Sequence, residues 1–143
     1  MQLKKEEKQM INKLKDRMLK EKKALTSLLL LLEKQYKCII NKDAFMLDSL
    51  VDEFKIVNKE VAIYEVERRK FLNGRIMKDI VLESNDKELD RIYRDVKIIL
   101  SNITLQKDTN DLLIKQQLSY TNKMLSIINP QRKNGTYNAY GRV

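Results

Sequence analysis

The stretch that decides the fold is "LDSLVDEFKIVNKEVAIYEVERRKFL", residues 47–72. Its apolar residues recur at alternating steps of three and four, a heptad pattern that continues for more than three heptads. A seam this narrow predicts a long helix over residues 43–73 that packs against one or two partner helices. Asn73-Gly74 then gives a helix C-terminal signal. The seam consists of Leu47, Leu50, Phe54, Val57, Val61, Tyr64, Arg68 and Phe71, with one charged interruption.

A first partner helix is predicted over residues 8–40. The apolar run 24–32, "ALTSLLLLL", is shorter than the about 20 residues that cross a bilayer, so we interpret it as a buried helix segment. It does not fit a signal peptide either, because a long charged region precedes it and "EKQYK" follows it. Asn41 is a plausible N-cap for the next helix, and Asp43 places a carboxylate in its first turn. The apolar stripe is Leu14, Met18, Leu25, Leu28, Leu29, Leu32, Tyr36 and Ile39 or Ile40.

A long helix over residues 86–128 is predicted to follow, and residues 75–83 either continue the previous helix or form a turn. Asn85 with Glu88 three places later resembles a capping box. At about 1.5 Å per residue the helix would be near 65 Å long, so it should kink near Asn110 or overhang its neighbours. The apolar seam of this helix is interrupted by three amide side chains, those of Gln106, Asn110 and Gln117. An overhang leaves an uncovered apolar stripe, which is typical of a binding surface or a dimer interface. The uncovered residues would be Leu112, Leu113, Met124, Ile127 and Ile128.

Composition agrees with an all-α fold, since the 143 residues include three glycines and one proline. Pro130 ends the helical pattern, and the tail "INPQRKNGTYNAYGRV" carries Tyr137 and Tyr140. We predict an elongated antiparallel bundle or coiled coil of three main helices. It forms one domain over residues 1–129, followed by a flexible tail over 130–143.

The residues that most enzymes use are missing or isolated. The chain has no histidine, so the usual general base and the Glu-x-x-His pair of di-iron bundles are excluded. A single cysteine, Cys38, allows neither an internal disulfide nor a thiolate zinc site, and we expect a buried thiol. Glu65 and Glu67 lie two apart on a helix and point in different directions, so ion pairs with nearby basic residues are expected. We predict no enzyme activity, no metal and no cofactor.

The formal net charge is +9, and residues 1–23 hold nine Lys or Arg against four Asp or Glu. Such a segment could meet nucleic acid or an anionic surface. Its lysines are interleaved with acids, and no aromatic residue lies among them to stack on bases. We therefore expect no nucleic acid and no stable membrane insertion, and a binder of this kind is the least favoured alternative.

With these elements placed, the chain resembles the FlgN family of flagellar type III export chaperones. The likeness lies in "LLEKQYKCIINKD" (31–43), in the second helix quoted above, and in "NDLLIKQQLSYTNKML" (110–125). The ending, with Gly135-Thr136-Tyr137 and Tyr140-Gly141, is similar to the "TY…G" endings of family members from Gram-positive bacteria. Many relatives are acidic, whereas this chain is basic.

The resemblance implies a cytoplasmic chaperone that binds the C-terminal segments of hook–filament junction proteins. It would keep them unassembled and deliver them to the flagellar export gate and ATPase complex. Tyr137 and Tyr140 would dock at the export gate. An alternative without an export role is a homo-oligomeric coiled-coil adaptor, so a homodimer stays open. The expected client-binding residues are Leu112, Leu113, Gln116, Tyr120, Met124 and Ile127.

Overall fold

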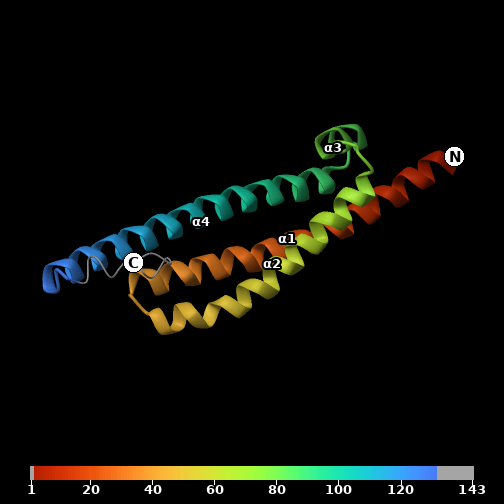
Figure 1. The fold of residues 1–143 in the computed structure, drawn as a ribbon. Coiled ribbons are helices and arrows are strands. Elements are labelled where there is room, and N and C mark those ends of the chain that lie inside the picture. The colour runs from red at the N-terminus through yellow and green to blue at the C-terminus, as the bar shows by residue number, and fades with distance from the viewer. Residues whose placement is uncertain (1, 132–143) are drawn as a thin grey trace. The chain divides into compact units, whose positions relative to one another are not determined.

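The computed structural model describes the backbone of residues 2–131 and the burial of side chains for residues 4–131. Four helices account for most of it (Figure 1). They are α1 (Gln2–Ile40), α2 (Ala44–Leu72), α3 (Met77–Ser84) and α4 (Lys87–Ile128). No strand occurs between residues 2 and 131, so the all-α prediction is confirmed. Residues 75–83 do not continue the preceding helix but contain most of α3.

Packing divides the described residues into two units, with the boundary between Lys107 and Asp108. The division falls within α4, which remains helical through it. The first unit contains α1, α2, α3 and the first part of α4. The predicted division between a domain over 1–129 and a tail stays a prediction.

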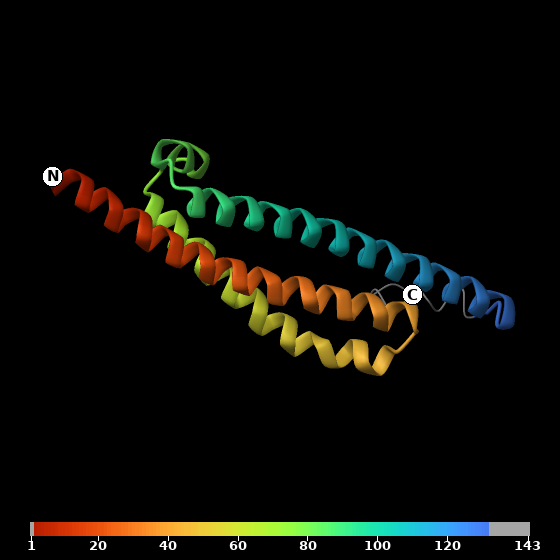
Figure 2. The ribbon, with the colours of Figure 1, turned by 180° about the vertical axis from the view of Figure 1, so that it is seen from behind.

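The heptad seam of α2 faces α1, and the two helices form an antiparallel hairpin (Figures 1 and 2). Near the turn, Leu50 of the seam is buried with Leu31 and Cys38 of α1, which confirms the buried thiol. Other seam residues remain half-buried, as expected for a stripe that meets one or two helices. The apolar run 24–32 contributes buried residues to this packing, and no described helix is long and apolar enough to cross a membrane.

The larger apolar core of the first unit joins all four helices. It buries Leu14 and Met18 of α1 together with Leu72 of α2, Ile80 of α3 and Leu89 of α4. At about 25 cal/mol per Å² of apolar surface, each such residue contributes about 1.5–3 kcal/mol, so this cluster holds the first part of α4 on the hairpin.

The charged interruption in the α2 seam has a partner within the α1 seam. Arg68 Nε donates to Glu21 Oε2 at 2.9 Å and to Oε1 at 3.2 Å. The Glu21 side chain is 6% exposed and that of Arg68 is 23% exposed. Because an unpaired charge at this depth is costly, the ion pair favours the register in which these two residues meet.

Two ion pairs show that α4 begins parallel to α1 and therefore antiparallel to α2. Lys15 contacts Glu88 at 3.4 Å and Lys22 contacts Asp95 at 3.0 Å, so both helices advance by one heptad in the same direction. The three long helices thus alternate in direction, as in an up-down-up bundle.

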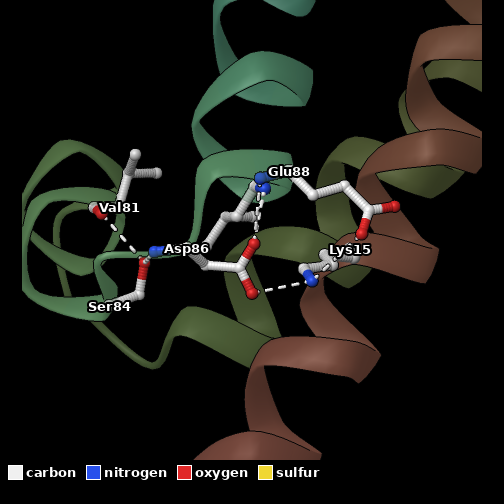
Figure 3. A network of polar contacts seen from close by, with 6 residues as sticks. Lys15, Val81, Ser84, Asp86 and Glu88 are labelled. Atoms are coloured by element: carbon white, nitrogen blue, oxygen red, sulfur yellow. Dashed lines mark hydrogen bonds and ion pairs between the residues drawn. The ribbon is translucent and has the colours of Figure 1, made fainter.

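Asp86 ties the start of α4 to α1 (Figure 3). Its Oδ1 accepts hydrogen bonds from the backbone N–H groups of Glu88 and Leu89, both at 3.0 Å, and its Oδ2 lies 2.7 Å from Lys15 Nζ. The hydrogen bond from Lys15 lowers the pKa of Asp86, and the same bond raises the pKa of Lys15.

Two predicted N-cap residues are wrong, one by two residues and the other by one. Asp43, not Asn41, caps α2, because its Oδ1 accepts from the Met46 N–H at 3.0 Å. Asp86, not Asn85, caps α4, since Asn85 adopts a left-handed conformation at the end of α3. In each case the carboxylate directly precedes the helix, where it also favours the positive end of the helix dipole.

Candidate functional site

The C-terminal part of α4, residues 108–128, carries the predicted client-binding residues. It contains no glycine or proline, and leucine, lysine, glutamine and methionine favour the helix. The sole proline follows at Pro130, beyond the last helical residue Ile128.

The six predicted residues share one face of this helix. At 3.6 residues per turn, they fall within about a third of the circumference. Leu112 is 57% exposed and Tyr120 is 61% exposed, while Gln116, Met124 and Ile127 are also exposed. Only Leu113, at the edge of this face, is half-buried. The structure therefore brings the predicted residues together on a largely uncovered apolar strip, which we call the α4 face: Leu112, Leu113, Gln116, Tyr120, Met124 and Ile127.

The amides that interrupt the α4 seam are not equivalent. Asn110 is buried, whereas Gln106 and Gln117 are half-buried, and all three have interaction partners. No buried side-chain nitrogen or oxygen among the described residues lacks a hydrogen bond. The amides are thus satisfied groups of a packed helix surface and do not belong to the exposed strip.

The opposite side of the same helix carries an apolar residue that the sequence analysis missed. Leu118 is 58% exposed, next to the half-buried Ile114 and Leu125. Its position four residues after Ile114 is the signal that could have revealed it. Lys115 and Lys123 are the only charged residues between Leu112 and Ile128, so this segment is apolar and basic.

The described residues offer little for catalysis or metal binding. No group of three or more Asp, Glu or Cys side chains among residues 4–131 could hold a metal ion. Glu65 forms an ion pair with Arg69 at 2.6 Å, as predicted for a helix surface. What the exposed α4 face can do is bind a complementary apolar surface.

Comparison with known proteins adds one match. The family model described as FlgN protein matches residues 10–143. No curated protein and no solved structure matches the chain. Tyr137 and Tyr140 fall within the matched range but lie outside the described residues.

Proposed function

Since the chain belongs to the FlgN family, non-enzymatic flagellar export chaperones for hook-associated proteins, we propose that its α4 face binds the C-terminal segments of the hook–filament junction proteins. The chaperone keeps these segments unassembled in the cytoplasm and delivers them to the export apparatus. The observation that carries the proposal is the exposure of four large apolar or thioether side chains on one helix face: Leu112, Tyr120, Met124 and Ile127.

The chemistry of this face suits a client that folds as it binds. An amphipathic segment that is disordered on its own can lay its apolar side along the strip as a helix. Met124 adapts to irregular surfaces, and Gln116 offers both a donor and an acceptor to the client. Lys123, whose nearest acidic residue in sequence is Asp111, favours a client with acidic side chains at its edge.

The test is a calorimetric titration with the C-terminal peptides of the two hook–filament junction proteins of the source organism. The variant Leu112→Asp/Tyr120→Asp changes the α4 face, and Leu118→Asp is a matched control because it is equally exposed on the opposite side. We expect saturable one-to-one binding by the wild type. The double variant should weaken it by about 100-fold or more, since two buried anchors contribute about 3 kcal/mol or more together.

Circular dichroism checks that both variants keep the helical content of the wild type. Absence of heat with either peptide would refute client binding by this chain. An equal loss of affinity in the Leu118→Asp control would refute the assignment to this face.

We further propose that Tyr137 and Tyr140 act as small aromatic anchors at the export gate. Deletion of residues 131–143 should then leave peptide binding unchanged and impair export of the client in cells. Export at wild-type rate by the truncated protein would contradict this role.

A further inference from the structure

A second apolar surface lies on the α1–α2 hairpin, within the first unit and away from the α4 face in sequence. Between the two helices is a hollow of about 360 Å³, whose apolar wall includes Leu30, Leu31, Ile56 and Val57. Leu30 is 60% exposed and Ile56 is 68% exposed, so their side chains are not used by the core of the chain. We call this surface the hairpin face.

Charged residues border the hairpin face as two strips of opposite sign. At 3.6 residues per turn, the strip on α1 is basic and the strip on α2 is acidic, and the side chains of both are exposed. Among the described residues no ion pair joins the two strips, and Lys20 pairs only with Asp16 of its own helix. The basic strip comprises Lys20, Lys23, Lys34 and Lys37, and the acidic strip comprises Glu53, Glu60 and Glu67.

The two strips have matching spacing along the hairpin. Lys34 and Glu53 line the same hollow from opposite helices, so they lie at about the same height, that is, the same distance from the turn along the hairpin. The bond between Glu21 and Arg68 places their neighbours Lys20 and Glu67 at a common height as well. Lys20 lies two heptads before Lys34 in α1, and Glu67 lies two heptads after Glu53 in α2. Because the two helices are antiparallel, both steps lead away from the turn by the same distance.

From this pattern we propose that the hairpin face binds a second copy of the chain. A two-fold axis along the hairpin places α1 of each copy over α2 of the other. Lys34 then faces Glu53 of the second copy, Lys20 faces Glu67, and Leu30 packs on Ile56. The surface is its own complement, as an isologous dimer requires.

The charges also select the orientation. A two-fold axis across the hairpin would place α1 over α1, with lysines facing lysines, and α2 over α2, with carboxylates facing carboxylates. Like charges that face each other disfavour that arrangement. The dimer is therefore two hairpins stacked face to face, with both turns at the same end. This inference does not depend on client binding, because the α4 face is not part of it.

The first test is the mass of the full-length chain in solution over a range of concentrations, by sedimentation equilibrium. We expect the mass to rise from the 17.0 kDa of one chain toward twice that value. Leu30→Asp/Ile56→Asp should stay monomeric. The control Ile98→Asp, at a residue of α4 that is 59% exposed, should associate as the wild type does. A wild-type mass of one chain at all concentrations, or association that the double variant leaves unchanged, overturns the proposal.

The second test exchanges the charges. Glu53→Lys places lysines against lysines at two symmetric positions and should raise the dissociation constant by at least about 10-fold. Adding Lys34→Glu restores opposite charges and should restore association. Failure of the second substitution to rescue the first overturns the predicted pairing of Lys34 with Glu53.

The orientation is tested by cross-linking after Cys38, the only cysteine, has been replaced by serine. Leu30→Cys and Ile56→Cys are made in separate chains and mixed under mild oxidation. The predicted axis brings the two different cysteines together, so the mixture should cross-link more than either chain alone. Preferred cross-linking of Leu30→Cys with itself overturns the proposed axis.

Discussion

The buried ion pair between Glu21 and Arg68 makes an asymmetric prediction about stability. The Glu21 side chain is 6% exposed, and Arg68→Ala removes the guanidinium group that neutralises its carboxylate. Removing one partner of a buried pair costs about 3–5 kcal/mol, and we take about 3 kcal/mol because Arg68 is 23% exposed, so water reaches part of the pair. Glu21→Ala should cost less, about 1–2 kcal/mol, because the longer Arg68 side chain is already 23% exposed and can reach water.

A third variant separates the charge from the packing. Glu21→Leu/Arg68→Met replaces the pair with apolar side chains that favour helices, so its free energy of unfolding should lie within about 1 kcal/mol of the wild type. The assay is urea unfolding of the three variants followed by far-UV circular dichroism. For a chain of this size about 3 kcal/mol corresponds to a fall in Tm of about 10 °C.

The result that would refute this reasoning is equal, small destabilisation by the two single substitutions. Losses below about 0.5 kcal/mol in both would mean that water already solvates the pair. The register of α1 against α2 would then depend on the apolar seam alone.

Three further predictions concern the first unit. Leu89→Ala should lower the free energy of unfolding by about 3 kcal/mol because this side chain is fully buried, as urea titration can measure. Gly74→Ala should cost about 1 kcal/mol through its φ of 82° alone, since no atom lies within 4 Å of the added Cβ; Gly74→Asn should cost less. Lys15→Met should destabilise the chain near neutral pH. Its deficit relative to the wild type should narrow as the pH falls through the pKa of Asp86, which is lowered from 3.8, because the carboxylate then takes up a proton. It should also narrow as the pH rises through the pKa of Lys15, which is raised from 10.5, because the wild-type ammonium group then loses its proton. A deficit that is constant with pH would contradict the last prediction.

The long helices were predictable because one physical signal dominates each of them. The seam of α2 repeats for more than three heptads, and the boundaries expected from it, 43–73, differ by one residue at each end from Ala44–Leu72. Asn73 and Gly74 both adopt positive φ, as the C-terminal signal indicates. Arg68 could be recognised as an interruption but not assigned a partner, because Glu21 lies 47 residues away and no local rule connects them.

The capping errors have a different cause. Asn41 and Asn85 each stand one or two residues before an aspartate, and either residue type can cap a helix. The choice depends on which residue of the turn takes the left-handed conformation. Lys42 and Asn85 take it here, which leaves Asp43 and Asp86 beside the first helical N–H groups. Asp86 has the further advantage that its second oxygen meets Lys15 of another helix, a contact that the sequence alone does not reveal.

For the α4 face, periodicity predicts which residues share a side of the helix but not whether that side is covered. The same spacing of apolar residues describes the seam of α2, which is buried or half-buried, and the strip from Leu112 to Ile127, which is mostly exposed. A helix that is only a connector gains nothing from keeping Leu112 and Tyr120 in water, since burying each would contribute about 1.5–3 kcal/mol. That unused free energy is available for binding a client. It is also the reason to compare Tyr120 with Leu118, because only a specific site should distinguish two equally exposed residues on opposite sides of one helix.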